Sequence, residues 1–581
     1  MSAEAVASEP APARVLLPLG AGAMVAAAFV AAWWWLDGDG RQVLLARALY
    51  WLMPLALALW LAALARARAV GGESALAWLR ARAGTAVAAA LAVAAVVVMS
   101  PPAMRMQFDE TSLLGTAFGM HAERAALMPL GALPAWDGGV AVTDWNLDKR
   151  PPLWPFLVSV AHDVAGLRVA NAFVANAVVL WALLALVGWR LRAAAGPLAG
   201  ALGIALLAGL PLLASCATSA GFETLALALL AAAVAAAIDC AQAPSAARSN
   251  ALLATVLLGA QARYESLPVL LVLLAVVGAR FAARERAANG WLAAMVAAVR
   301  RWPRDRATGW LLAAAPLLLA PLALLLVHGR DAMFYPEAKG QPLVALAHFT
   351  DHLGPLLAAL FAWGPQPFAA LPTLLAVAAG ALAFGRPAGR TVASACLALP
   401  VAAATAIALL WFYGDVREDT ARRLFLPLAA LLALLPALAC AAWRAPKAAA
   451  ALLVAALAAA AWNLTALRRE EALPRYAAAV MLDAVDAALA GMRPDPRRTL
   501  LVSAVAQYLI VQGHAAATPQ QFLTRRPRLP DAVDVVVLTT PLDDACRAHA
   551  GDPRDVLAGG NAQLLGEVPG ALRVAAWRLA R

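Results

Sequence analysis

Stretches of about 20 apolar residues recur along most of this chain and are separated by short polar segments. A helix of about 20 apolar residues is long enough to cross a bilayer, and helices satisfy their own backbone hydrogen bonds there. The pattern therefore predicts a polytopic α-helical membrane protein. We predict about thirteen spans, at 15–36, 42–64, 84–101, 167–189, 196–215, 222–239, 250–262, 265–283, 309–328, 366–385, 391–413, 424–443 and 447–466.

The least regular part of the pattern is 250–283, where two short apolar runs flank a polar group that includes Arg263 and Glu265. A single span here would place the arginine-rich loop 280–308 on the outer side, against the positive-inside rule. We therefore expect two short or tilted helices that meet near the outer surface. Arg263 and Glu265 would then lie at membrane depth beside a cavity.

Charge gives the orientation of the spans. Arginines concentrate in short loops such as 65–82 and 280–308, which predicts that these loops are cytoplasmic. The acid-rich loops 103–150, 329–352 and 414–423 then lie outside. The net charge of +11 reflects this loop bias and does not indicate a nucleic-acid partner. We expect a multi-pass protein of the bacterial inner (plasma) membrane, in contact with membrane lipids.

The composition changes after residue 467, where charged, proline and turn residues become frequent. TLLVSA (499–504) and VDVVVLTT (533–540) are typical of buried strands, and 475–491 and 542–549 are typical of helices. We predict three parts: an N-terminal two-span extension with a cytoplasmic loop (1–83), a transmembrane domain (84–467), and a small extracytoplasmic α/β domain (468–581). The apolar helix at 151–166 is expected to dip into the outer leaflet without crossing.

The longest polar segment of the first 280 residues is the loop 103–150. Loops of this length in a compact domain are uncommon and are often functional. Charged groups at membrane depth are costly, so each one at an outer span end is a candidate for function. All are predicted to face one outward cavity: Asp109 and Glu110; Asp148, Lys149 and Arg150; Glu223; Arg263 and Glu265; His328, Arg330 and Asp331; and Arg417, Arg422 and Arg423.

Carboxylates beside several fixed cations suit transfer from a phosphate-linked donor. One carboxylate can accept the proton of an acceptor hydroxyl. Cations, or a divalent metal ion held by carboxylates, can stabilise the leaving phosphate. A membrane location favours a donor that is itself a lipid. The five cysteines show no spacing that indicates a disulfide framework or a zinc site.

The sequence FDE just after a span, the long outer loop ending DKRPPLWP, and an acid that opens a later outward-facing helix resemble one family. These features are similar to the C-type, polyprenyl-phosphate-dependent glycosyltransferases, in the branch of protein O-mannosyltransferases and the lipid A aminoarabinose transferase. The resemblance implies that Asp109 is the catalytic base. It also implies that Lys149 contacts the donor phosphate, although Arg150 is inserted before the prolines.

The resemblance covers roughly residues 84–330. Glu223 matches a second-loop acid linked to a metal or to site structure, which is more often Asp in the family, and Arg330 resembles a phosphate-binding position in a later outer loop. We therefore assign catalysis to Asp109 and Glu110, donor-phosphate binding to Lys149, Arg150, Arg263 and Arg330, and support to Asp148, Glu223 and Glu265. A divalent metal is the one cofactor considered, and its ligands stay unassigned.

Each of these residues also has a purely structural interpretation. Asp109 and Glu110 could form a solvated helix terminus, Glu223 could be an acid favoured by the helix dipole, and Arg263 with Glu265 could be a structural ion pair. Of Arg417, Arg422 and Arg423, at least two are expected to contact lipid headgroups. These alternatives stay open at the level of sequence.

The functional hypothesis is a membrane glycosyltransferase that moves a sugar from a polyprenyl-phosphate carrier to an acceptor on the outer face, with inversion. The acceptor can be a lipid, a glycan or a protein. The main alternative is a multi-span transporter or lipid flippase, which predicts charges inside the spans and two related halves. A third is a scaffold that presents the C-terminal domain, and a related lipid-linked polymerase also fits.

Overall fold

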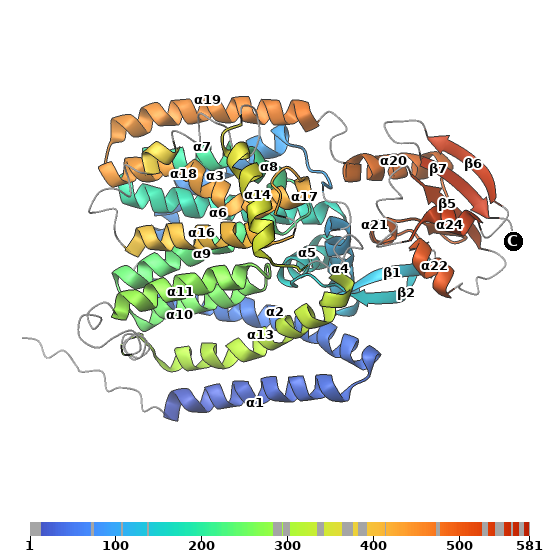
Figure 1. Ribbon diagram of the computed structural model, residues 1–581, viewed down its shortest axis with the longest axis horizontal. Helices are drawn as coiled ribbons and strands as arrows, with labels where there is room; N and C mark the ends of the chain where they lie inside the picture. The colour runs from blue at the N-terminus through green and yellow to red at the C-terminus, as the bar shows by residue number, and fades with distance from the viewer. Residues whose placement is uncertain are drawn as a thin grey trace, which may run out of the picture.

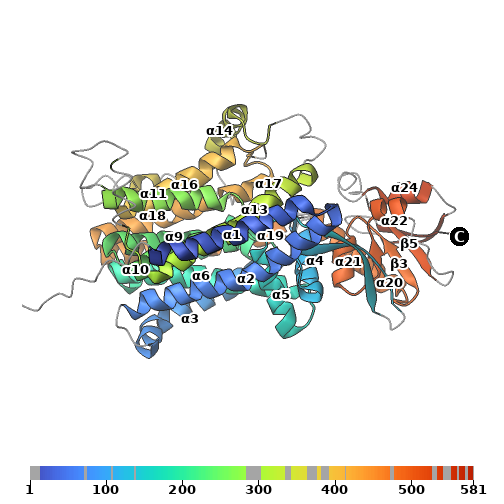
Figure 2. The same cartoon turned by 90° about the horizontal axis from the view of Figure 1, so that it is seen from below.

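The computed structural model describes residues 13–70, 75–105, 109–135, 139–282, 293, 302–333, 342–362, 376–380, 392–412, 414–471, 477–525, 533–540, 551–558, 562–568 and 574–579. The long helices run along a common axis, and an α/β unit lies beyond one end of this bundle (Figure 1). The view from below shows the same division into two parts (Figure 2).

Nine helices within the described residues are long and apolar enough to cross a membrane. They are α1 (Ala13–Trp35), α2 (Gly38–Ala69), α3 (Ala75–Met99), α6 (Ala170–Ala195), α9 (Glu223–Gln242), α13 (Arg306–Met333), α16 (Val392–Leu410), α18 (Leu426–Trp443) and α19 (Pro446–Glu471). The helices α7 (Pro197–Ala208) and α8 (Pro211–Ala217) meet the same criterion only when taken together, and the pair, a broken span or a re-entrant loop, is bent by 73°. Pro211 explains the break, because the residue before a proline avoids helical backbone angles.

The predicted number of thirteen spans is not confirmed. The predicted span at 366–385 lies largely outside the described residues. Within it, only 376–380 are described, and they are helical. The region 250–283 does form two helices, α10 (Ala246–Ala260) and α11 (Ser266–Ala282), joined by a turn. This agrees with the preferred interpretation, and both helices are shorter than a full span. Most of the loop 280–308 lies outside the described residues.

The loop 103–150 is folded, which the sequence analysis did not foresee. It contains α4 (Asp109–Glu123) and an antiparallel hairpin of β1 (Leu127–Pro134) and β2 (Val140–Leu147). Gly119 allows α4 to approach the hairpin, because a Cβ atom there would lie 1.8 Å from the carbonyl oxygen of Leu127. The following helix, α5 (Leu153–Ala165), has 13 residues and is too short to cross the bilayer, as expected.

The C-terminal region contains the remaining strands and short helices. They are α20 (Ala477–Met492), β3 (Thr499–Val502), α21 (Ala506–Val511), β4 (Ala516–Ala517), α22 (Pro519–Arg525), β5 (Asp534–Thr539), α24 (Pro553–Ala558), β6 (Ala562–Val568) and β7 (Val574–Leu579). The two predicted strands correspond to β3 and β5, and the predicted helix at 475–491 corresponds to α20. The predicted helix at 542–549 lies outside the described residues.

One seven-stranded sheet joins the loop 103–150 to the C-terminal region. Its order is β2-β1-β4-β3-β5-β7-β6, with Gly131 of β1 paired to Ala517 of β4. β3 runs parallel to β4 and β5, and the other neighbours are antiparallel. α21 also packs on α4. Because of this shared sheet, the loop and the C-terminal strands lie on the same side of the helical bundle.

The remaining described elements complete the bundle around the site. α14 (Leu346–Leu360) packs on α16, and α17 (Asp419–Arg422) leads through the 3₁₀ helix η3 (Arg423–Phe425) into α18. The N-terminal helices are integrated into the bundle, since α1 packs on α13 and α2 packs on α10 and α13.

Candidate active site

Asp109 lies at the centre of an ion-pair network at the end of the bundle nearest the α/β unit. One of its oxygens pairs with Arg150 and the other pairs with Arg423. Arg423 also reaches Glu223, at 2.7 Å from nitrogen to oxygen. Arg150 in turn pairs with Asp148 at 2.8 Å. Residues from three distant parts of the chain therefore share one charged cluster.

Local backbone structure explains why these side chains converge. Asp109 and Glu223 are the first residues of α4 and α9, where the helix dipole favours a negative charge. Arg150 precedes Pro151, which disfavours a helical backbone at Arg150, and α5 begins only at Leu153. Arg423 begins η3, the short break that precedes α18.

A second group of charges comes from the turn between α10 and α11. Guanidinium nitrogens of Arg263 lie 3.3 Å from a carboxylate oxygen of Glu265 and 3.8 Å from one of Glu223. The guanidinium carbon also lies over the ring of Phe222, 4.9 Å from its centroid. The hydroxyl of Tyr264 donates a hydrogen bond to the carbonyl oxygen of Lys149 at 2.7 Å. This contact ties the turn to the end of the loop 103–150.

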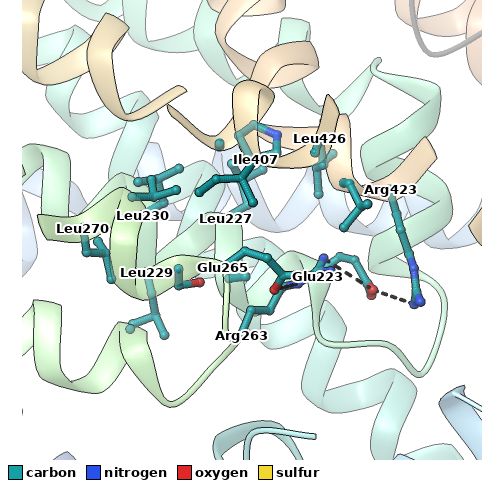
Figure 3. A pocket seen from close by; sticks show the side chains of 18 of the residues that line it. Glu223, Leu227, Leu229, Leu230, Arg263, Glu265, Leu270, Ile407, Arg423 and Leu426 are labelled. Atoms are coloured by element: carbon teal, nitrogen blue, oxygen red, sulfur yellow. Dashed lines mark hydrogen bonds and ion pairs between the residues drawn. The ribbon is translucent and has the colours of Figure 1, made fainter. Parts of the chain in front are cut away.

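The charged cluster lies at the end of a largely apolar pocket between α9, α11, α16 and α18. The pocket comprises about 710 Å³ of space, part of which is open to solvent. Glu223, Arg263, Glu265 and Arg423 line its polar end, and Leu227, Leu230, Leu270 and Ile407 line the apolar part. Figure 3 shows Glu223 between Arg263 and Arg423, with Leu229, Leu230 and Leu270 farther along the cavity on the side away from Arg423. The site therefore joins cations and carboxylates to a hydrophobic chamber.

The Asp109 carboxylate is held in its charged form. Burial by itself would raise the pKa of Asp109, but the guanidiniums of Arg150 and Arg423 outweigh this effect and hold the pKa well below its usual range. Burial lowers the pKa of Lys149, and the neighbouring positive charge of Arg150 lowers it further. The cluster is therefore a set of fixed opposite charges.

Glu110 occupies a different environment from Asp109. Glu110 is 1% exposed. One of its carboxylate oxygens accepts hydrogen bonds from the backbone N–H groups of Arg105 at 3.0 Å and Ala220 at 3.3 Å. Burial raises the pKa of Glu110 to about 7, and the nearby charge of Glu223 adds to this rise. The contacts join the segment before α4 to the segment before α9. They favour a positioning role for Glu110 over the predicted catalytic role.

The structure brings together most of the residues that the sequence analysis selected: Asp109, Asp148, Arg150, Glu223, Arg263 and Glu265, with Lys149 at the edge. Arg330 lies near the end of α13, and its side chain is outside the described part of the structure, as are those of His328 and Asp331.

Arg423 is the central residue to which the sequence reasoning gave no role, although it was a candidate as one of three arginines before a span. The available sequence signal was that Arg423 directly precedes the apolar span at 424–443. By contrast, Arg417 is exposed and pairs with Asp415, and Arg422 donates to the carbonyl oxygen of Val416 at 3.1 Å.

The described residues hold no ready-made ligand set for a divalent metal ion. They contain no group of three or more His, Cys, Asp or Glu side chains placed to hold an ion. The oxygens of Asp109 and Glu223 face arginine guanidiniums, which occupy the positions that a cation would need.

No protein-family model and no curated protein sequence matches this chain. Among solved structures, the chain is similar to the crystal structure of ArnT from Cupriavidus metallidurans bound to undecaprenyl phosphate, with a TM-score of 0.57 and 12% identity. The similarity covers 87% of this chain and 98% of ArnT. The zinc- and sulfate-bound oligosaccharyltransferase of Archaeoglobus fulgidus matches with a TM-score of 0.46 and 15% identity, over 82% of this chain and 71% of that one.

ArnT is the lipid A aminoarabinose transferase, so the similarity confirms the predicted C-type glycosyltransferase fold. At this level of identity the comparison establishes the fold and leaves the roles of individual residues to the geometry of the site.

Proposed function

We propose that this chain is a membrane glycosyltransferase that moves a sugar from a polyprenyl-phosphate carrier to an acceptor on the outer face of the membrane. The observation that carries the proposal is the position of Arg263 and Arg423 at the polar end of an apolar pocket. A polyprenyl-phosphate sugar has the matching chemistry, because its hydrocarbon chain suits the leucine-lined chamber and its phosphate suits the guanidiniums. The co-crystallised undecaprenyl phosphate of the ArnT structure supports the same donor class.

In the reaction we propose, an acceptor oxygen attacks the anomeric carbon of the sugar, and the bond from that carbon to the phosphate oxygen breaks. The electron pair leaves with the polyprenyl phosphate, whose charge is stabilised by Arg150, Arg263, Arg423 and Lys149. Asp109 accepts the proton of the acceptor hydroxyl and later releases it to water. A single displacement of this kind inverts the anomeric centre.

The ion pairs of Asp109 suggest how the donor activates the base. An arriving phosphate competes with the Asp109 carboxylate for Arg150 and Arg423. When the guanidiniums turn to the phosphate, Asp109 loses the interactions that lower its pKa, and it becomes a stronger base. The donor therefore prepares the carboxylate that the acceptor needs. Asp148, Glu223 and Glu265 hold the arginines in place, and Glu110 positions the two helix starts.

The position of the charged groups favours a transferase over a transporter or flippase. A transport path requires polar groups along the spans, whereas the ion pairs of the site gather at one end of the bundle. The acceptor stays open among lipids, glycans and proteins. We also propose that the loop 103–150 and residues 468–581 face the extracytoplasmic side of a bacterial inner membrane.

A direct test uses purified protein, a synthetic polyprenyl-phosphate sugar and a membrane extract that supplies acceptors. We expect the sugar to leave the carrier in the presence of extract and to appear in one acceptor class. Mass spectrometry of membrane glycolipids and glycoproteins from a deletion strain would identify that class. A carrier that moves across vesicle membranes with its sugar still attached would instead support the flippase alternative.

A further inference from the structure

Figure 2 shows α5 and α21 close to the junction between the helical bundle and the α/β unit. A second groove lies at this junction. One wall is the turn Leu167–Val169 between α5 and α6. The facing walls come from the end of α20, with Arg493, and from the end of α21, with His514. The groove holds about 1020 Å³ of space open to solvent and shares no lining residue with the candidate active site.

Two arginines give this groove a positive charge. Arg168 on one wall and Arg493 on the other are both exposed, and neither guanidinium has a hydrogen-bond or ion-pair partner among the described residues. The acid in the groove, Asp486, is already engaged. It accepts hydrogen bonds from the hydroxyl of Tyr508 at 2.7 Å and from the side-chain amide of Gln512 at 3.2 Å. The two cations are therefore available to an anionic ligand.

The groove also lies beside the start of a helix that is long and apolar enough to cross a membrane. Arg168 stands two residues before the spanning helix α6. On the neighbouring surfaces, Val160 and Val164 of α5 are 42% and 84% exposed, and Val174 of α6 is 59% exposed. Exposed valines beside a span indicate contact with lipid chains, and arginines at such a boundary contact headgroups.

We propose that this groove binds the phosphate headgroup of an anionic membrane phospholipid. The phosphate lies between the guanidiniums of Arg168 and Arg493, which suit phosphate in charge and geometry. The acyl chains lie against the exposed valines of α5 and α6. Because Arg493 belongs to the α/β unit and Arg168 to the bundle, the lipid bridges the two parts of the protein. This role is separate from sugar transfer.

The test measures lipid retention by the full-length protein and does not depend on enzymatic activity. Detergent-solubilised protein is titrated with phosphatidylglycerol or phosphatidylcholine, and native mass spectrometry counts the bound lipids. In the double variant Arg168→Gln with Arg493→Gln, we expect one phosphatidylglycerol to bind about tenfold more weakly, as two headgroup contacts are lost. The matched control is Arg497→Gln with Arg498→Gln, which removes the same charge from exposed positions outside the groove.

Three results would overturn the proposal. The first is unchanged phosphatidylglycerol retention in the double variant. The second is equal retention of phosphatidylcholine by the unmodified protein at the same site. The third is displacement of the lipid by soluble glycerol phosphate at equal concentration, which would assign the groove to a water-soluble anion. If the double variant does not fold, the single variant Arg168→Gln must still show weaker retention than Arg497→Gln.

Discussion

Asp109 and Arg423 lie 314 positions apart in the sequence, and their side chains form an ion pair. Asp109 begins the helix that follows the third predicted span, whereas Arg423 begins the short 3₁₀ helix before α18. The pair therefore closes the site between the first and last parts of the helical bundle. Through Glu223, the same arginine connects this contact to the mouth of the apolar pocket.

This position of Arg423 predicts a strong effect on donor binding. In Arg423→Gln the donor phosphate loses a charge-assisted contact, which typically costs about 1.5–3 kcal/mol. We expect the KM for the polyprenyl-phosphate sugar to rise by about tenfold to a hundredfold. The matched control is Arg417→Gln, since Arg417 is exposed and pairs outside the site with Asp415. Equal KM values for both variants would remove Arg423 from donor binding.

Asp109→Asn tests the proposed base. Asparagine keeps the shape of the side chain but cannot accept a proton at neutral pH, and loss of general base catalysis typically costs about 10²–10⁴-fold. We expect the variant to fold and to bind donor, yet to transfer sugar at least a hundredfold more slowly in single-turnover experiments. Normal transfer by this variant would assign proton removal to another group, or would indicate an acceptor that is already ionised.

The fold and most of the site could be predicted because their signals are local. Runs of apolar residues identify the spans, and charged residues at span ends identify the site, as Glu223 and Arg263 illustrate. Residues 499–502 and 534–539 are strands as predicted, because continuous β-branched and apolar runs are typical of buried strands.

The missed features depend on contacts between distant segments. The strand β1 has a weak local signal because it contains Pro129, Gly131 and Pro134, which are rare inside strands, and it also pairs with the distant strand β4. Likewise, the sequence around Arg423 does not reveal that it faces Asp109 while Arg422 turns to a backbone carbonyl. The adjacent acids Asp109 and Glu110 look equivalent in sequence, and their surroundings in the structure separate them: Asp109 pairs with arginine guanidiniums, and Glu110 accepts from backbone N–H groups.

The shared sheet yields a prediction about topology. Because β1 pairs with β4, the hairpin and the C-terminal strands must lie on one side of the membrane, which we propose is the outer side. In a Cys546→Ser background, Thr524→Cys should react with a membrane-impermeant maleimide in intact cells. Ala243→Cys, exposed in the short connection after α9, should react only after lysis. Equal labelling of both before lysis would contradict this orientation.

Lys149 predicts a pH dependence of donor binding. Burial lowers its pKa from the ordinary lysine value of 10.5, so its positive charge is lost at a lower pH than that of an exposed lysine. Donor affinity should therefore be high at neutral pH and fall as the pH rises, before an ordinary lysine would titrate. Lys149→Ala should weaken donor binding at neutral pH, and Lys149→Arg should retain binding without the alkaline decline. If donor affinity falls at the same alkaline pH in Lys149→Arg, a group other than Lys149 causes the decline.

Arg330→Ala extends the same experiment to the end of α13. The sequence resemblance assigns Arg330 to phosphate binding, and we expect a smaller rise in the donor KM than for Lys149→Ala. Donor titrations of the two variants under identical conditions give the comparison. If donor dependence is unchanged in both, neither side chain belongs to the phosphate site.

Glu110 predicts a pH dependence of stability that is separate from catalysis. Its pKa is about 7 in the folded protein and 4.5 in an unperturbed chain, so the folded state binds more protons between these values. The stability that Glu110 contributes should therefore be greatest below about pH 4.5, fall as the pH rises toward 7, and then become constant, with a total change on the order of 1–3 kcal/mol. Glu110→Gln retains an oxygen that can accept the N–H groups of Arg105 and Ala220, but it cannot ionise. We expect this variant to transfer sugar at near-normal rates and to lose the decline, as measured by denaturant unfolding at pH 5 and pH 7.5. An inactive Glu110→Gln beside an active Asp109→Asn would instead assign the base to Glu110.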